Sequence, residues 1–181
     1  MIINLDITLH RYPCSILSLD VQDIMGSHTV NVHGSLTKNK LDSNGRVIGQ
    51  EVYRKAKLSH DDSQEEEEMP DIELVQKEIK NNEGCQVFGH FYVNKVPGNF
   101  HMSSHAYGRI VQQLASMGML RFDVSHTINS LSFGENAELS KIRKNIKSEF
   151  VNPLERVTKD NGKGINNKVY EYYLKVSFDY F

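Results

Sequence analysis

Two histidines, His101 and His105 in the segment HMSSH, have a spacing that could support chemistry. On a helix, positions four apart would place both imidazoles on one face, where they could bind a metal ion. His101 follows a Pro-Gly-Asn turn, however, and continues a segment that we interpret as a strand. No third ligand lies at a persuasive distance along the sequence. We therefore predict no metal site and no cofactor, and we interpret both histidines as structural or solvent-facing.

Motifs for nucleophilic or nucleotide chemistry do not occur in the sequence. There is no G-x-S-x-G elbow. Gly84, Gly89 and Gly98 match neither G-x-x-x-x-G-K-[ST] nor G-x-G-x-x-G, the two phosphate-binding patterns. We expect no catalytic residues and do not expect the domain to be an enzyme in its own right.

The two cysteines, Cys14 and Cys85, fit two interpretations. Buried reduced thiols are common in cytosolic proteins, whereas one disulfide would be expected in an oxidising compartment. No C-x-x-C is present, which excludes a thioredoxin-type redox centre and zinc sites built on paired cysteines. The residues alone leave the choice between thiols and a disulfide open.

The composition is typical of one globular domain, with 181 residues, 39% hydrophobic and 24% charged. The formal net charge of -2 offers no basic excess that would attract nucleic acid or an anionic membrane. We expect no signal peptide from the first residues, and no apolar run approaches the roughly 18–20 residues of a membrane-spanning helix. This pattern fits a cytosolic protein, and it equally fits a fragment cut from between membrane anchors.

Alternation of apolar and polar residues predicts a mainly β protein. Residues 2–9 alternate most regularly at the start of the chain, as a strand with one buried face would. Asn44-Gly45 lies between two short segments and is a strong signal for a hairpin. The other segments with strand-like character are residues 17–22, 27–36, 84–102, 121–133 and, most clearly, 169–181.

Helical spacing is confined to three stretches, residues 71–82, 107–120 and 138–150, and we assign no function to the last two. Residues 59–68 read SHDDSQEEEE and contain nothing that could be buried. We predict a single domain over residues 1–181, with an acidic flexible loop at residues 59–70. Because no β-α-β alternation occurs, the predicted fold is an antiparallel β-sandwich with two or three short helices.

Ordered motifs resemble those of the endoplasmic reticulum vesicle (ERV) family. A strand with a Pro-Cys pair and an S-L-D-x-x-D run resembles the N-terminal signature of the family, and a G-C segment ending in G-N-F-H resembles its central signature. The matches cover most of the chain and are specific in combination. They are INLDITLHRYPCSILSLDVQDIMG (Ile3–Gly26), EGCQVFGHFYVNKVPGNFHM (Glu83–Met102), VSHTINSLSFG (Val124–Gly134), Asn152-Pro153-Leu154 and Tyr172–Val176.

The resemblance implies a twisted β-sandwich that lies in the lumen, between two transmembrane helices that would flank this sequence. Family members are cargo receptors that cycle between the endoplasmic reticulum and the Golgi in coated (COPII) vesicles. The implied partners are cargo proteins, a paralogous receptor subunit and the vesicle coat, the last through tails absent here; nucleic acid is not among them. Some members carry a cysteine-rich insertion where this chain has its acidic stretch, so functions tied to that insertion are not expected.

The resemblance also assigns roles to individual residues. Cys14 and Cys85 fall inside the two strongest motifs, so an oxidising lumen would favour one structural disulfide between them. The stretch SLDVQDIMGSH resembles relatives fused to a thioredoxin domain, which makes the non-catalytic part of a protein disulfide isomerase the alternative function. Four histidines in or beside the motifs could sense pH or bind a partner, with a purely structural role as the alternative. They are His90, His101, His105 and His126.

Overall fold

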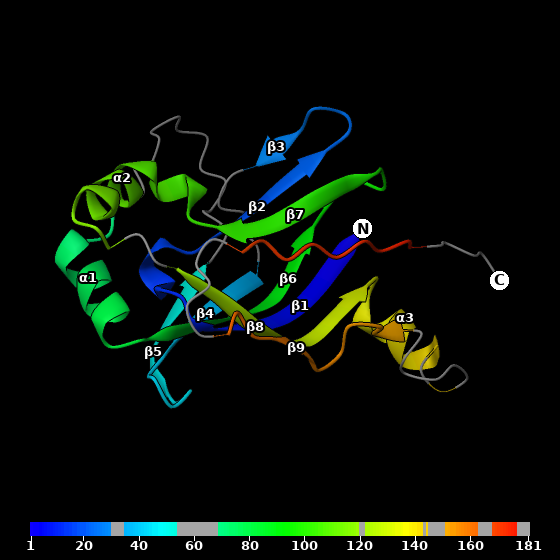
Figure 1. Ribbon diagram of the computed structural model, residues 1–181. Helices are drawn as coiled ribbons and strands as arrows, with labels where there is room; N and C mark the ends of the chain where they lie inside the picture. The colour runs from blue at the N-terminus through cyan, green and yellow to red at the C-terminus, as the bar shows by residue number, and fades with distance from the viewer. Residues whose placement is uncertain are drawn as a thin grey trace.

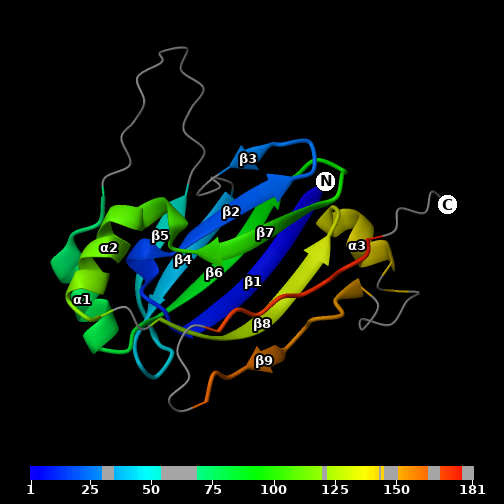
Figure 2. The ribbon, with the colours of Figure 1, turned by 45° about the horizontal axis from the view of Figure 1, so that its top comes forward.

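Two antiparallel β-sheets stack face to face in the computed structural model of the protein (Figures 1 and 2). The structure describes residues 1–29, 35–53, 69–119, 122–142, 144, 151–162 and 168–176. Within these residues the larger sheet has six strands and the smaller has three. In spatial order, the larger sheet contains β5 (Val47–Tyr53), β4 (Ser35–Leu41), β6 (Gly84–Tyr92), β1 (Ile2–Arg11), β8 (Asp123–Phe133) and β9 (Val157–Lys159). The smaller sheet contains β3 (His28–Thr29), β2 (Ser18–Asp23) and β7 (Gly98–Ser103).

The side-chain alternation of β1 fits its place inside the larger sheet. Ile3, Leu5, Ile7 and Leu9 are all buried, while the residues between them are only partly buried. β1 pairs antiparallel with β6 on one side and with β8 on the other. The predicted fold class, mainly β with antiparallel sheets in a sandwich, is confirmed.

The main hydrophobic core lies between the two sheets. Leu5 and Phe91 enter it from the larger sheet, and Leu19 enters it from the smaller. Phe100 of β7 packs against this core, with its ring centroid 5.6 Å from that of Phe91. These contacts fix which face of the smaller sheet points inward and therefore which residues are left on its outer face.

Glycines allow one tight turn and one close strand approach. The predicted hairpin at Asn44-Gly45 joins β4 to β5, and Gly45 takes the positive φ of 78° that such turns require. Gly89 of β6 has a φ of 130°, and a Cβ there would lie 2.0 Å from the Ser35 carbonyl oxygen of β4. Only glycine therefore fits at position 89 without moving one strand away from the other.

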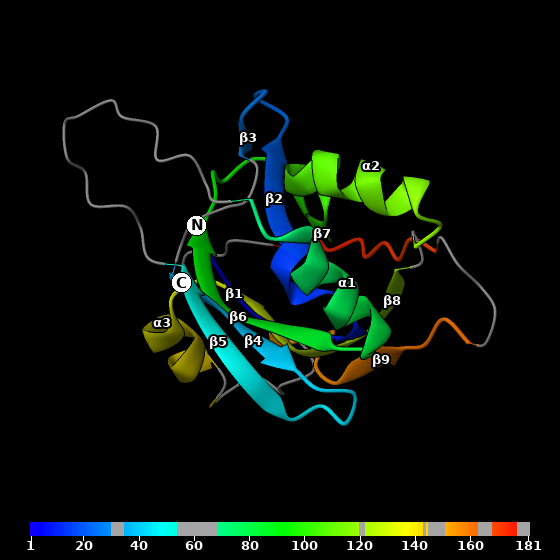
Figure 3. The ribbon, with the colours of Figure 1, turned by 90° about the vertical axis from the view of Figure 1, so that its left-hand side faces the viewer.

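α1 and α2 lie side by side at one end of the sandwich, and α3 lies at the opposite end (Figures 1 and 3). Ile16, Val75 and Leu114 are fully buried beside α1 and α2 in a second, smaller core. The Asp71 side chain caps α1 by accepting a hydrogen bond from the Glu73 backbone N–H. The helical elements in the described residues are η1 (Cys14–Ile16), α1 (Ile72–Lys80), η2 (His105–Tyr107), α2 (Gly108–Ser116) and α3 (Asn136–Ile142). None of these helices is long and apolar enough to cross a bilayer.

The strand predicted over residues 169–181 is wrong for residues 169–176, which form no strand. Tyr172 packs on the main core and contacts His126 of β8, but β8 already has β1 and β9 as its two neighbours. The segment therefore has no backbone partner there, although alternate side chains up to residue 173 are partly buried. Other predictions lie partly outside the described residues. The main parts are residues 30–34 of the predicted strand 27–36, residues 59–68 of the acidic loop, residues 145–150 of the predicted helix 138–150, and residues 177–181 of the predicted last strand.

Candidate functional site

The pairing of β2 with β7 places Asp20 directly opposite His101. Directly opposed residues of an antiparallel pair present their side chains on the same face of the sheet. The next pair along, Leu19 and Met102, faces the main core. Asp20 and His101 therefore lie on the outer face of the smaller sheet.

A third side chain joins this pair because the chain leaves β7 at Ser103 and begins η2 at His105. The His105 Nδ1 atom lies 3.2 Å from the His101 Nε2 atom, and the two rings meet edge to face. The Asp20 Oδ2 atom is 3.3 Å from His101 Nε2 and 3.7 Å from His105 Nδ1. Three polar atoms thus converge on one point.

Burial and hydrogen bonding hold the carboxylate of this cluster in place. The Asp20 side chain is 0% exposed, whereas the side chains of His101 and His105 are 36% and 73% exposed. The Ser103 hydroxyl donates to Asp20 Oδ2 at 3.2 Å and accepts from the His105 backbone N–H at 3.1 Å. A buried carboxylate beside two imidazoles that reach solvent offers three ligand atoms of the kinds that bind a metal cation.

The structure supplies the third group that sequence spacing did not reveal. His101 and His105 were the predicted candidates, and the prediction of no metal site depended on the missing third ligand. Asp20 lies far from them in the sequence, on a strand that only the β2–β7 register brings alongside. The signal was present in the S-L-D run of a predicted strand, but the pairing of that strand could not be deduced from periodicity.

His126 of β8 lies apart from this cluster and has partners for both ring nitrogens. Its Nδ1 atom is 2.8 Å from the Val124 carbonyl oxygen, and its Nε2 atom is 2.8 Å from the Tyr172 hydroxyl. Because a carbonyl oxygen can only accept, Nδ1 carries the proton and Nε2 accepts from Tyr172 in the neutral ring. This arrangement attaches the C-terminal segment to the larger sheet, which is a structural role.

His90, the last predicted histidine, lies on β6 of the larger sheet, where its ring packs edge to face on Tyr92. The Tyr92 side chain is largely exposed. The structure therefore brings together two of the four predicted histidines, His101 and His105, and leaves His90 and His126 on the other sheet.

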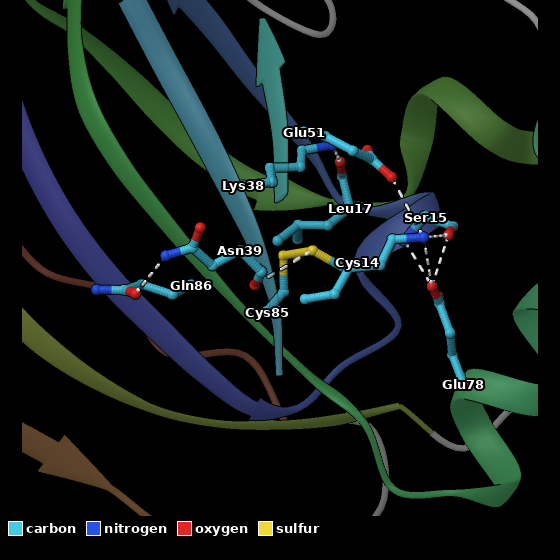
Figure 4. Close-up of a disulfide and its surroundings, with 10 residues drawn as sticks. Cys14, Ser15, Leu17, Lys38, Asn39, Glu51, Glu78, Cys85 and Gln86 are labelled. Atoms are coloured by element: carbon cyan, nitrogen blue, oxygen red, sulfur yellow. Dashed lines mark hydrogen bonds and ion pairs between the residues drawn. A yellow bond between two sulfur atoms is a disulfide. The ribbon is translucent and has the colours of Figure 1, made fainter. Parts of the chain in front are cut away.

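The predicted disulfide joins Cys14 of η1 to Cys85 of β6 (Figure 4). Both cysteines are fully buried, and their Cα atoms are 4.9 Å apart. The bond links η1, which follows β1, to β6 of the larger sheet across a sequence separation of 71. No free cysteine remains.

A buried polar cluster that the sequence did not indicate lies beside the disulfide (Figure 4). The carboxylate of Glu78 in α1 accepts from the Ser15 hydroxyl at 2.6 Å and from the Ser15 backbone N–H at 3.1 Å. The Lys40 ammonium group lies 3.1 Å from Glu78 and 3.2 Å from Glu51. Burial disfavours the charged ammonium, but the two carboxylates outweigh it and raise the pKa of Lys40. The cluster fixes α1 against η1 and β4.

Two known protein families match the chain. The sequence model described as "Endoplasmic reticulum vesicle transporter" matches residues 29–179. The chain belongs to this ERV family. A second family, described as "Endoplasmic Reticulum-Golgi Intermediate Compartment (ERGIC)", matches residues 1–30. The resemblance that the motifs indicated is confirmed.

Individual relatives of this ERV-family chain are intermediate-compartment proteins. It is 29% identical to a "Probable endoplasmic reticulum-Golgi intermediate compartment protein 3" of Dictyostelium discoideum, over 96% of this chain and 56% of the relative. It is 26% identical to the human "Endoplasmic reticulum-Golgi intermediate compartment protein 2", over 96% of this chain and 47% of the relative. The chain thus spans about half the length of these curated relatives. Among solved structures, the "Crystal Structure of Erv41p" is similar, with a TM-score of 0.47 and 19% identity over 88% of this chain and 63% of that chain.

The thioredoxin-fused branch of the ERV family is not indicated by these relatives, whose names mention no such fusion. Both cysteines of this chain are consumed in the buried disulfide, so they offer no dithiol for exchange. Membership of the disulfide isomerase branch stays a prediction from one sequence stretch, residues 18–28.

Proposed function

We propose that this chain is the lumenal domain of a membrane-anchored cargo receptor that cycles between the endoplasmic reticulum and the Golgi in coated vesicles. The observation that supports it is the match to the vesicle transporter family over residues 29–179. The buried Cys14–Cys85 disulfide fits an oxidising lumen, since such bonds are rare in the cytosol.

The partners proposed for the parent protein are secretory cargo, a paralogous receptor subunit and the vesicle coat. Because the chain spans about half of its relatives, coat binding is assigned to regions of the parent outside this domain. A role in binding cargo or the paralogous subunit is assigned to the domain itself. The pH-sensing role of the four histidines stays a prediction, and His126 already has a structural role.

Cross-linking of the full-length parent in its native membrane, followed by identification of the partners, tests this function. We expect secretory cargo and a related receptor subunit to be captured, and the parent to enter vesicles budded from endoplasmic reticulum membranes. The matched control is a parent from which the domain is deleted, which should keep coat contacts and lose cargo. Exclusion of the parent from budded vesicles would overturn the proposal.

The alternative function is the non-catalytic part of a protein disulfide isomerase, which the stretch at residues 18–28 favours. It requires a C-x-x-C in a thioredoxin pattern elsewhere in the parent, since this chain has none. The full-length sequence decides between the two functions. An isomerase assay on the purified parent, with insulin or scrambled ribonuclease as substrate, gives an independent answer.

A further inference from the structure

We propose that Asp20, His101 and His105 form a binding site for a divalent transition-metal ion, with Zn²⁺ as the best match. The proposal rests on the geometry of the outer face of the smaller sheet and does not depend on the transport role. The candidate ligand atoms are Asp20 Oδ2, His101 Nε2 and His105 Nδ1, and each residue offers one of them.

The distances between these three atoms match those between the ligands of a tetrahedral zinc ion. They are 3.2, 3.3 and 3.7 Å. Zinc bonds to imidazole nitrogen and carboxylate oxygen are about 2.0–2.1 Å long, so neighbouring ligand atoms around a tetrahedral ion lie about 3.3–3.4 Å apart. Within the plane of the three atoms, the equidistant point lies about 2.0 Å from each, so an ion about 0.5 Å above that plane would be about 2.05 Å from all three, at the length of a zinc bond. An ion could therefore enter without a shift of β2 or β7.

The donor types select among metals. Two imidazole nitrogens and one carboxylate oxygen suit Zn²⁺ and its transition-metal neighbours. Ca²⁺ prefers six to eight oxygen ligands and Mg²⁺ an octahedral oxygen shell, which this set cannot supply. Three protein ligands also leave a fourth tetrahedral position for water or a ligand atom of another molecule.

The surroundings of the cluster resemble those of a metal site. Asp20 is fully buried and His105 is mostly exposed, so the open position faces solvent and offers an entry path. The Ser103 hydroxyl binds Asp20 Oδ2 and the His105 backbone, which orients two of the three ligands from outside the coordination shell.

Hydrogen bonding alone is the competing explanation of the same geometry. At 3.2 Å, the two facing imidazole nitrogens can share one proton, and a protonated imidazole can pair with Asp20. In that case hydrogen bonds would hold the cluster together and it would bind no metal. The two explanations differ in what titration with Zn²⁺ shows.

Isothermal titration of the tag-free 181-residue chain with Zn²⁺ tests the proposal. We expect one saturable site per chain, and His105→Ala should weaken the affinity by about tenfold or more. His105 is exposed, so this variant should keep its thermal stability without metal. His10→Ala, which removes another exposed histidine from the larger sheet, is the matched control and should leave the affinity unchanged.

Co²⁺ provides a second readout, because a tetrahedral Co²⁺ site absorbs in the visible range. The absorbance should appear with the wild-type chain, vanish on addition of Zn²⁺ and be lost in both Asp20→Asn and His105→Ala. Should Asp20→Asn fail to fold, His105→Ala still decides the matter. Absence of saturable Zn²⁺ binding, or equal affinity in the wild type, His105→Ala and His10→Ala, would overturn the proposal.

Discussion

Glu78 of α1 and Lys40 of β4 form an ion pair of 3.1 Å in which the carboxylate is 1% exposed. Removal of one partner from a buried pair leaves the other charge uncompensated. Lys40 keeps Glu51 and some solvent contact, so Glu78→Gln should lower the free energy of unfolding by about 2–3 kcal/mol, below the usual range for fully buried pairs. Urea denaturation measures the change.

A matched control for this prediction is Glu73→Gln on the same helix. Glu73 is exposed, and its loss should cost less than about 1 kcal/mol. Equal destabilisation by the two substitutions would show that the buried pair has no special role in holding α1.

The Cys14–Cys85 disulfide should account for a large part of the stability of the domain. In the chain-entropy model, closing a loop with a sequence separation of 71 stabilises the fold by roughly 4 kcal/mol. We expect the double variant Cys14→Ala/Cys85→Ala to unfold at a much lower urea concentration than the oxidised wild type. Thiol titration of unreduced, denatured wild type should detect no free thiol, and two reactive thiols would contradict the structure.

The sequence predicted the strands well where a strand pairs with another strand on each side and its side chains alternate between buried and partly exposed. In β1, the period of two identifies the inward face because one side of the sheet packs on the core and the other does not. The same period misled at residues 169–176, where Tyr172 is partly buried by side-chain contacts although none of the described strands pairs with the segment. Hydrophobic periodicity reports which side chains are covered and carries no information on backbone partners.

Two of the three residues of the candidate site could be identified from the sequence. His101 and His105 stood out because both lie in one short segment, and their distance depends only on a local turn from β7 into η2. Asp20 joins them through the register of β2 against β7, a long-range pairing that one sequence does not specify. The Glu78 cluster was missed for a similar reason, since an acidic residue on a predicted helix normally faces solvent.

Asp123 should make stability depend on pH in the acid range. Burial disfavours its charged form, but hydrogen bonds from Ser125 and Arg11 outweigh this, so the pKa of the Asp123 carboxyl lies below its ordinary value. The group therefore stabilises the fold above its unfolded pKa, near 3.8, and this contribution is lost as the pH falls through the lower folded value. Urea midpoints at pH 7, 4 and 3 for the wild type and Asp123→Asn measure the effect.

The difference in urea midpoint between the wild type and Asp123→Asn should be largest at pH 7 and shrink below about pH 4. Protonation of Asp123 removes the stabilising carboxylate charge from the wild type, and the substitution has already removed that charge from the variant. Asp71→Asn, which removes an exposed charge and keeps a side-chain oxygen that can cap α1, provides a comparison in another part of the fold. A difference between wild type and Asp123→Asn that stays constant down to pH 2 would contradict the assigned pKa direction.

Tyr172 should hold the C-terminal segment against β8 through its hydrogen bond to His126. Tyr172→Phe removes the hydroxyl donor and leaves the Nε2 atom of a largely buried ring without that partner, so we expect a loss of about 1 kcal/mol in unfolding free energy. Amide hydrogen exchange should show faster exchange in residues 168–176 than in β1 or β6, where the strands have ladder partners on both sides. Tyr173→Phe is the matched control, because the Tyr173 side chain is 89% exposed and bonds only within its own segment, to Glu171. Equal exchange rates and equal stabilities in the two variants would show that the segment is held by the apolar contacts of the Tyr172 ring and not by its hydroxyl.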